Sequence, residues 1–288
     1  MILITGANGK TGHAIIKRLL LNGEKIRALV HKVEQIEELK SLGEMEVVAG
    51  DMLNQETMNK AFDGIRAVYH ICSAINPDEV EIGKIAINAA HSAKIEHFVY
   101  HSVLHSLLAE MPHHQKKLMV EQLLVNSGLT YTIIQSTVFM QNILESSKLL
   151  TKNGIFEQRF FGSKETRMCM VDLKDLAEAV SIILTNTGHG GATYEICGPQ
   201  NLYLNDMLVV LKNHFGYEIK AETTPVEIWT AKLKKYGVGD YQIDTLLKMF
   251  KHYTEHGFIG NSNTLTWILG RKPNDFSSFI SREMQSKL

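Results

Sequence analysis

Residues 4–12 read ITGANGKTG and directly follow the apolar first residues of the chain. The letters GKT are typical of the end of a triphosphate-binding loop. Such a loop needs G-x-x-x-x-G-K-[ST], however, and Ile4 stands where its first glycine would be. Because Ile4 also lies within a predicted strand over residues 1–5, the triphosphate interpretation fails.

The three glycines of this stretch predict a different phosphate site. Gly6, Gly9 and Gly12 lie between a predicted strand and a predicted helix over residues 12–22. In that context glycines allow a tight turn and let the helix N-terminus approach a pyrophosphate. Three glycines alone could form only a structural bend, whereas strand, loop and helix together favour dinucleotide binding. We assign to this cofactor contact Gly6, Asn8, Gly9, Lys10, Thr11 and Gly12.

The first part of the chain alternates β-branched runs with amphipathic stretches. This alternation predicts repeated βαβ units, hence an α/β fold with a mostly parallel sheet. Strands are predicted over residues 1–5, 25–30, 46–49, 67–71, 97–101 and 130–135, and helices over 12–22, 33–42, 55–63, 79–93 and 114–127. Gly23 and Gly128 suit helix C-termini, while Asn54 and Asp78 suit helix N-caps.

After residue 136 the regular alternation of predicted strands and helices ends. Helices are predicted over 138–150, 173–185 and most of the chain from 204, with strands over 154–161, 167–171 and 193–197. We therefore predict two domains. Residues 1–152, with a contribution from about 172–198, form the dinucleotide-binding core; residues 153–171 and 199–288 form a smaller α+β lobe on the substrate side.

The end of the second predicted strand bears on the choice of cofactor. An NAD site places an Asp or Glu about 20 residues after the glycines, where it binds the ribose 2′-hydroxyl. This strand instead ends in RALVHK, without a carboxylate. His31 and Lys32, helped by Lys10, can neutralise a 2′-phosphate. NADP(H) is therefore favoured, and NAD(H) is the alternative if these are ordinary surface residues.

Two further strand ends supply candidate cofactor contacts. Asp51, followed by Met52, can accept a hydrogen bond from the adenine amino group or simply cap its own loop. Cys72 and Ser73 follow the fourth predicted strand and should flank the cofactor. As a redox sensor Cys72 would need an activating cation, and none stands near it in the sequence.

The composition argues against several classes of function. A formal net charge of −1 gives no general attraction to nucleic acid or anionic membranes. No apolar run approaches the roughly 20 residues of a membrane span, and no leader is recognised, so we expect a cytoplasmic protein. Three cysteines without CxxC spacing support neither disulfides nor zinc. No histidine pair has the HExxH pattern, so no metal is expected.

An ordered series of segments resembles the NmrA-like family of atypical short-chain dehydrogenase/reductases. The series covers nearly the whole chain and comprises ITGANGKTG, RALVHK, VVAGDM, HFVYHS, KLMVEQLLVNSGLTYTIIQ, FMQN, VDLKDLAEA, YEICGP and ILGRKPNDFSSFI. The resemblance implies a doubly wound Rossmann sheet of order 3-2-1-4-5-6-7, a small C-terminal lobe and a substrate cleft. Members of the family include NADPH-dependent quinone, dye and isoflavonoid-type reductases, sugar-nucleotide epimerases, and NADPH sensors that bind regulatory proteins.

Standard short-chain dehydrogenases carry Tyr-x-x-x-Lys on the helix after strand five, where the ammonium lowers the phenol pKa and holds the nicotinamide ribose. Lys117 occupies the lysine position, but His113 stands four residues before it, and Tyr100 lies too far upstream. Lys117 is thus a predicted ribose contact or a surface lysine. His113 is a candidate proton donor or one of an exposed pair. Ser102 can hydrogen-bond a substrate oxygen.

Loss of the tyrosine argues against alcohol–ketone interconversion and sugar epimerisation, which need a positioned acid/base. Hydride delivery to an electrophilic acceptor needs less, because solvent can complete the protonation. Phe139 and Asn142, just past the sixth predicted strand, are candidate substrate contacts. Gln135 stands where the family often has arginine, which puts in doubt any anionic group held there.

We therefore predict an NADPH-dependent oxidoreductase that reduces small apolar electron acceptors of the quinone, dye, azo or enone type. The alternative is a non-catalytic, NADP(H)-sensing regulatory protein, a redox sensor that binds a protein partner. A sugar-nucleotide epimerase fits less well, because the sequence offers no acid/base pair for it.

Overall fold

The computed structural model describes residues 1–73, 75–147, 154–158 and 165–285. The chain forms two compact units: unit 1 contains Met1–Ser136 and Lys174–Tyr194, and unit 2 contains Thr137–Leu173 and Glu195–Leu288. The sequence predicts the first boundary at residue 152, whereas unit 2 already begins at Thr137. The reason is that β7 (Val138–Phe139) pairs with a strand of unit 2 instead of continuing into a core helix.

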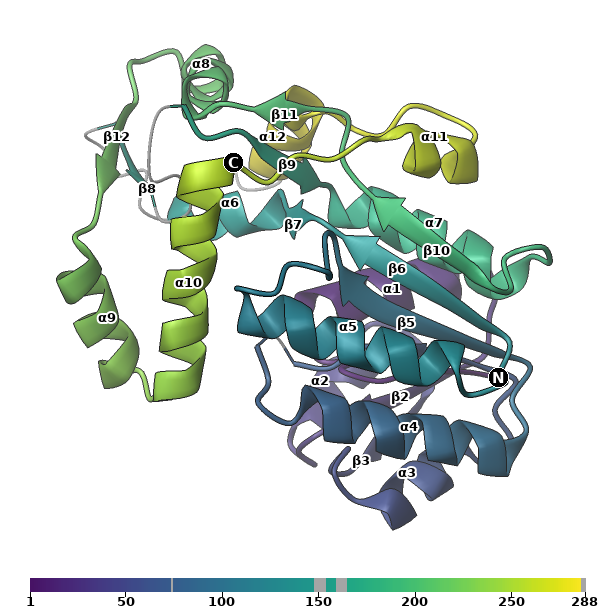
Figure 1. Cartoon of the computed structure of the whole chain (residues 1–288). Coiled ribbons are helices and arrows are strands. Elements are labelled where there is room, and N and C mark those ends of the chain that lie inside the picture. Colours follow the sequence, from purple (N-terminus) through teal and green to yellow (C-terminus); the bar gives the residue numbers. More distant parts are fainter. Residues whose placement is uncertain (74, 148–153, 159–164, 286–288) are drawn as a thin grey trace. The chain divides into compact units, whose positions relative to one another are not determined.

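The main sheet has seven strands in the order β10-β6-β5-β4-β1-β2-β3 (Figure 1). Its members are β1 (Ile2–Ile4), β2 (Ile26–Val30), β3 (Glu46–Ala49), β4 (Ala67–His70), β5 (His97–Val103), β6 (Tyr131–Ser136) and β10 (Ala192–Ile196). Counted along the chain, this is the doubly wound order 3-2-1-4-5-6-7, so the predicted fold is confirmed. The three residues of β1 are fully buried, as expected for a parallel strand covered on both faces.

Helices cover both faces of this sheet within unit 1. On one face, α1 (Lys10–Leu21) meets α7 (Leu173–Thr185) through an Arg18–Glu178 ion pair of 3.2 Å. On the other face, α3 (Gln55–Phe62), α4 (Glu79–Ala93) and α5 (Pro112–Val125) lie side by side (Figure 1). The short α2 (Gln35–Lys40) follows β2.

Helices α4 and α5 approach each other closely. A Cβ added at Gly83 would lie 2.8 Å from both methyl groups of Val120, so only glycine allows this spacing. The contact fixes α4 against α5 and thereby sets which side chains of the two helices can meet.

Most predicted helix ends are confirmed. Gly23 and Gly128 adopt φ values of +77° and +76° at the C-terminal ends of α1 and α5. The Asn54 side chain accepts a hydrogen bond from the Thr57 backbone N–H at 2.9 Å and caps α3. Asp78 is the N-cap residue of α4 as predicted, but its side chain makes no cap hydrogen bond. The Asp78 backbone N–H donates to Asn76 Oδ1 at 2.9 Å.

The described residues of unit 2 form two small sheets and most of the remaining helices. One sheet has the order β11-β9-β7, and in the other β8 pairs in parallel with β12. The elements not yet given are α6 (Gln141–Ser147), β8 (Ile155–Gln158), β9 (Met168–Val171), β11 (Asn201–Leu202), α8 (Leu204–Phe215), β12 (Lys220–Thr223), α9 (Val226–Lys235), α10 (Asp240–His256), α11 (Asn263–Leu269) and α12 (Phe276–Gln285). The ends of the predicted helix 138–150 and strand 154–161 lie outside the described residues.

A buried carboxylate organises unit 2. Asp172 is fully buried and accepts from Arg282 at 2.8 Å, Asn274 at 2.9 Å and Gln141 at 2.7 Å. The segments VDLKDLAEA and ILGRKPNDFSSFI therefore meet through the Asn274–Asp172 hydrogen bond, and Arg282, just beyond the second segment, adds the ion pair. None of the helices in the described ranges combines the length and the mean hydropathy that a bilayer-spanning segment requires.

Candidate functional site

The three glycines of the loop differ in whether the surrounding structure requires a glycine. Gly6 has a φ of +56°, and a Cβ there would lie 2.7 Å from the Ile71 carbonyl oxygen. A Cβ at Gly12 would lie 2.5 Å from the Ala7 carbonyl oxygen. Gly9 differs, because its φ is −80° and the nearest atom to an added Cβ, the Gly6 carbonyl oxygen, is 3.3 Å away. The protein's own packing therefore requires Gly6 and Gly12, and does not require Gly9.

Gly9 is also the N-cap of α1. It has extended backbone, provides no capping side chain and is exposed, and the first turn of α1 contains no acidic residue. Such a helix start presents backbone N–H groups and the positive end of the helix dipole. The loop thus fits a phosphate group that approaches over Gly9. Beside it, Lys10 is exposed and Asn8 is half-buried, while Thr11 is buried at the start of the helix.

His31 and Lys32 lie at the same edge of the sheet as the glycine loop. β1 and β2 run parallel with Ile4 opposite Ala28, so their carboxyl ends are adjacent. Both side chains are exposed beyond the end of β2. The Lys32 ammonium and the His31 ring are accordingly accessible to an anionic group at this edge.

At the end of β3, the Asp51 carboxylate accepts from the Leu53 backbone N–H at 2.9 Å. The loop-capping interpretation of Asp51 is therefore confirmed, and the adenine contact stays a prediction. Met52 is half-buried and packs against the hydrophobic core between the sheet and its helices.

Cys72 and Ser73, which follow Ile71 after the end of β4, differ in exposure. Cys72 is buried, and burial together with the neighbouring Glu79 carboxylate raises the pKa of its thiol to about 12. The thiol therefore stays protonated at neutral pH, which argues against a redox-sensor role. Ser73 is exposed and accepts from the Asn76 side-chain amide at 3.0 Å.

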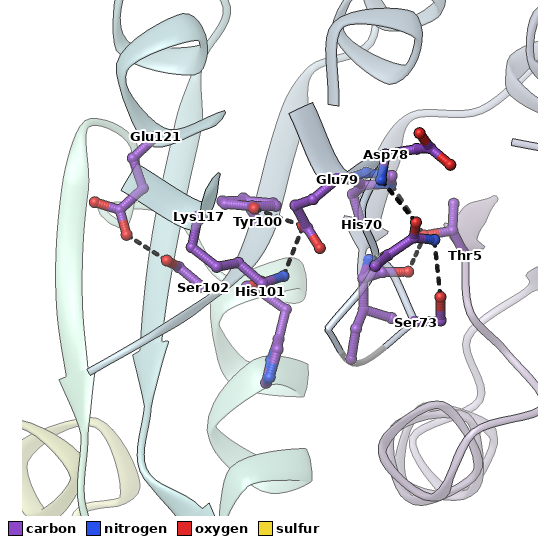
Figure 2. A network of polar contacts seen from close by, with 12 residues as sticks. Thr5, His70, Ser73, Asp78, Glu79, Tyr100, His101, Ser102, Lys117 and Glu121 are labelled. Atoms are coloured by element: carbon purple, nitrogen blue, oxygen red, sulfur yellow. Dashed lines mark hydrogen bonds and ion pairs between the residues drawn. The ribbon is translucent and has the colours of Figure 1, made fainter. Parts of the chain in front are cut away.

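Lys117 is buried, so the surface-lysine alternative is wrong. Its ammonium donates to Glu79 Oε1 at 2.7 Å and to the His101 carbonyl oxygen at 2.9 Å (Figure 2). The hydroxyl of Tyr100 donates to the same Glu79 oxygen at 2.8 Å, and the Lys117 ammonium lies 5.0 Å from the Tyr100 ring. A tyrosine and a lysine therefore do meet in space, although Glu79 stands between them and Tyr100 is fully buried.

The same cluster extends to the strand that precedes the glycine loop. The Tyr69 hydroxyl lies 2.5 Å from His101 Nδ1, and Thr5 Oγ1 lies 3.0 Å from His70 Nδ1. His70 stacks on Tyr100 with ring centroids 6.1 Å apart. We call this group the buried polar cluster; its members are Thr5, Tyr69, His70, Cys72, Glu79, Tyr100, His101 and Lys117.

Burial sets the protonation states in the cluster. Burial lowers the pKa of His70 to about 4 and that of His101 to about 3, so both imidazoles are neutral at pH 7. For Glu79, burial by itself disfavours the charge, but Lys117 and the hydrogen bonds from Lys117 and Tyr100 hold the carboxyl pKa below its usual value. Glu79 and Lys117 thus form a buried ion pair.

Ser102 belongs to a second polar group next to this cluster. Its hydroxyl donates to Glu121 (Figure 2). Glu121 also accepts from Ser106 at 3.1 Å and from the Gln135 amide at 3.0 Å. Ser102 and Glu121 are both buried. Gln135, at the position where the family often has arginine, therefore binds an acidic side chain of the protein itself.

His113 is half-buried, and burial together with the nearby Lys117 charge lowers its pKa to about 3. The neighbouring His114 is fully buried, and its Nδ1 lies 2.9 Å from the His105 carbonyl oxygen. The exposed-pair interpretation is therefore wrong. An imidazole with so low a pKa is unprotonated at pH 7 and has no imidazolium proton to donate, which argues against His113 as the proton donor. Within the described residues, no three His, Cys, Asp or Glu side chains gather as a metal site needs.

Phe139 and Asn142 belong to unit 2. Phe139 lies in β7 opposite Val171 of β9, and Asn142 lies in the first turn of α6; both are half-buried. Their role as substrate contacts stays a prediction.

The sequence prediction missed Glu79. In the sequence it is one of several acidic residues in DEVE at a helix start, which is the usual place for a solvated charge. Nothing in that pattern distinguishes it from Glu81, which is exposed. Only the packing of α4 against α5 brings Glu79 to Lys117.

Residues 1–285 match the model of the NmrA-like family. The chain belongs to this family. It is 24% identical over 283 residues to quinone oxidoreductase 2 of Escherichia coli, covering 98% of each chain. It is 24% identical over 281 residues to the NAD(P)H azoreductase of Xenophilus azovorans, covering 97% of this chain and 96% of that protein.

Solved structures share the fold. The E. coli NADPH-dependent quinone oxidoreductase complexed with NADPH superposes with a TM-score of 0.83 at 23% identity, covering 99% of this chain and 100% of that one. The Citrobacter sp. triphenylmethane reductase complexed with NADP(H) gives a TM-score of 0.83 at 22% identity, covering 98% and 99% of the two chains. At this level of identity, the structural likeness establishes the Rossmann-type fold.

Proposed function

We propose that this protein is an NADPH-dependent reductase that delivers a hydride to small apolar electron acceptors of the quinone, azo, dye or enone type. The observation that carries the proposal is the start of α1 at Gly9, where no side chain caps the helix. Contacts within the protein do not require a glycine at this position, so a phosphate that approaches over Gly9 explains it. The quinone- and azo-reducing relatives of similar length support the proposed acceptor class.

Bound NADPH would supply the hydride. The residues proposed to hold it are Gly6, Asn8, Gly9, Lys10, Thr11 and Gly12 at the pyrophosphate, His31 and Lys32 at the 2′-phosphate, Asp51 and Met52 near the adenine, and Cys72, Ser73 and Lys117 near the nicotinamide ribose. NAD(H) is the weaker candidate, because the end of β2 provides two basic side chains and no carboxylate.

The hydrogen bonds and protonation states of Tyr100, Ser102 and His113 support electron acceptors that need no proton from the protein. The Tyr100 hydroxyl donates to Glu79, and burial raises its pKa well above the usual value. The Ser102 hydroxyl donates to Glu121, and the pKa of His113 is lowered to about 3. Epimerisation at a hydroxyl carbon would need such an acid/base, whereas a reduced quinone or dye can take its proton from solvent. Phe139 and Asn142 are the proposed contacts for the acceptor.

NADPH oxidation with a panel of quinones, azo compounds and triphenylmethane dyes tests the activity, in parallel with NADH. In the cofactor test, the Gly9→Ala variant should bind NADPH at least about tenfold more weakly, because the added methyl occupies the phosphate approach. The double variant His31→Ala/Lys32→Ala should lose affinity for NADPH and retain most of its affinity for NADH.

Lys25→Ala is the matched control, since Lys25 is an exposed lysine just before the amino end of β2, the opposite end from His31 and Lys32. Its NADPH affinity should equal that of the wild type. Equal weakening of NADPH and NADH in the double variant would refute the 2′-phosphate assignment. NADPH binding without turnover of any acceptor would instead favour the alternative, an NADP(H)-sensing protein with a regulatory partner.

A further inference from the structure

Two acceptors of the protein hold the Lys117 ammonium, and neither is a tyrosine. An ammonium carries three N–H groups. Among the described residues, one donates to Glu79 at 2.7 Å and one to the His101 carbonyl oxygen at 2.9 Å. One N–H remains, and its direction is set by the other two.

The position of Glu79 is itself well determined. Glu79 is the first residue of α4, its side chain is only 1% exposed, and it also accepts from the Tyr100 hydroxyl of β5. The close approach of α4 to α5 at Gly83 holds the helix that carries it. Glu79 therefore connects α4, α5 and β5 at the point where Lys117 enters the cluster (Figure 2).

We infer that Glu79 is a positioning residue for the nucleotide: its carboxylate keeps Lys117 charged and leaves the remaining N–H to a ribose hydroxyl of NADPH. The inference rests on the proposed function. In Tyr-x-x-x-Lys enzymes the partner of the lysine is a tyrosine, whereas here it is the Glu79 carboxylate, and the effect on the lysine is the opposite. The ammonium charge is balanced and is not available to lower the pKa of a phenol.

The reason that Lys117 needs Glu79 is electrostatic. A buried ammonium without a counter-ion loses its proton easily, and its pKa can fall by several units. The titratable side chains around Lys117 are Tyr69, His70, Cys72, Glu79, Tyr100, His101, His113, His114 and Glu121. Glu121 already accepts hydrogen bonds from Ser102, Ser106 and Gln135, which leaves Glu79 as the acidic partner of Lys117.

Most of these neighbours do not change charge between about pH 6 and pH 9. Burial lowers the pKa of His70 to about 4 and those of His101 and His113 to about 3, and it raises that of Cys72 to about 12. The pKa values of Tyr69 and Tyr100 are raised well above the usual range by burial. His114 and Glu121 are the same in wild type and variants, so a new alkaline limb in a Glu79 variant reports Lys117.

The test is the dissociation constant of NADPH from pH 6.5 to pH 9, followed by NADPH fluorescence. The wild type is the reference at each pH, because His31 and Lys32 at the proposed 2′-phosphate site are the same in wild type and variants. The affinity of the Glu79→Gln variant relative to the wild type should fall about tenfold between pH 6.5 and pH 9, because Lys117 loses its proton. Adding Lys117→Met to Glu79→Gln should weaken binding at every pH and remove the alkaline limb.

Glu56→Gln is the matched control, because Glu56 pairs with Lys60 at 2.8 Å on the exposed surface of α3. It should follow the wild type. If Glu79→Gln does not fold, as judged by near-UV circular dichroism, Glu79→Asp takes its place. The shortened carboxylate keeps the charge, so we expect weaker NADPH binding with the pH profile of the wild type, and unchanged affinity would overturn the inference.

A Glu79→Gln pH profile parallel to the wild type would show that Glu79 only supports the fold. An alkaline limb that persists in the Glu79→Gln/Lys117→Met variant would assign it to another group and would also overturn the inference. Failure of the proposed function has a different signature, since the wild type itself would then bind no NADPH at any pH.

Discussion

The glycine loop and the buried polar cluster lie next to each other in unit 1 but are specified differently. The loop depends on residues 6–12, and its strained backbone and close contacts involve Gly6 and Gly12 directly. The cluster depends on side chains from β4, α4, β5 and α5 and from the segments that follow β1 and β4, and its central ion pair joins residues 38 positions apart. The loop therefore requires a backbone shape, whereas the cluster requires mutually satisfied charges and hydrogen bonds.

This difference determines how each region should respond to a substitution or to a change of protonation. A side chain added to the loop meets backbone atoms and disturbs the structure locally. A change of charge in the cluster leaves a buried group without its partner, which costs more than the net value of the interaction. Conditions that alter protonation should therefore affect the cluster far more than the loop.

Acidification is expected to have the largest effect. The folded pKa values of His70, His101 and His113 lie at about 4, 3 and 3, below the ordinary value of 6.5. The unfolded chain therefore binds more protons as the pH falls below 6.5, and stability is lost towards the folded pKa values. Each histidine contributes a slope of about 1.4 kcal/mol per pH unit. The pKa of Glu79 is held below the ordinary glutamate value of 4.5, so the loss of its charge adds to the destabilisation below that pH.

Urea unfolding at pH 7, 6 and 5 measures this dependence. His101→Gln should reduce the slope, and His91→Gln, in the last turn of α4 where the residue is exposed, is the matched control. A free energy of unfolding that stays constant from pH 7 to pH 5 would contradict the burial of neutral histidines.

Gly12→Ala should have an intermediate effect. The added Cβ meets the Ala7 carbonyl oxygen at 2.5 Å and the Gly6 carbonyl oxygen at 2.7 Å, so backbone has to move. We expect a loss of about 1–3 kcal/mol in the free energy of unfolding, which chemical denaturation can measure. Gly9→Ala is the comparison and should cost clearly less, since its nearest contact is 3.3 Å. Equal costs would remove the distinction between the two glycines.

Asn54→Ala should have the smallest effect of the three. It removes the side-chain bond of 2.9 Å to the Thr57 N–H at the start of α3, worth about 1 kcal/mol. Asp78→Ala is the control, because Asp78 precedes α4 without a side-chain cap bond. Thermal unfolding of the two variants compares them directly. A larger loss for Asp78→Ala would show that the caps are assigned to the wrong residues.

The candidate site could be predicted from the sequence only in part. The glycines and the basic residues at the end of β2 are recognisable because their spacing to a strand and a helix is local. Lys117 is recognisable through its place in α5, but its environment is not: the sequence leaves a surface lysine as an alternative, and the structure buries it against Glu79. The Ser102 hydroxyl of β5 donates to Glu121 of α5, and burial together with the Lys117 charge lowers the pKa of His113.

The boundary of unit 2 shows the same limit. The stretch after residue 136 has a helical pattern, yet its first residues form β7 because β9 offers a strand to pair with. Strand pairing between distant segments overrides a local preference whenever it satisfies backbone hydrogen bonds that would otherwise be buried without partners.

By itself, the amino-acid sequence determined the α/β class, the positions of the main strands and helices, and the glycine turn of ITGANGKTG between strand and helix, because each follows from residues within one or two turns or strands. Only the tertiary structure decided which buried groups form an ion pair. Glu79 meets Lys117 because Gly83 lets α4 approach α5 and because Tyr100 projects from β5 to the same carboxylate. Such contacts depend on how separate elements pack together, and no local pattern of residues encodes that.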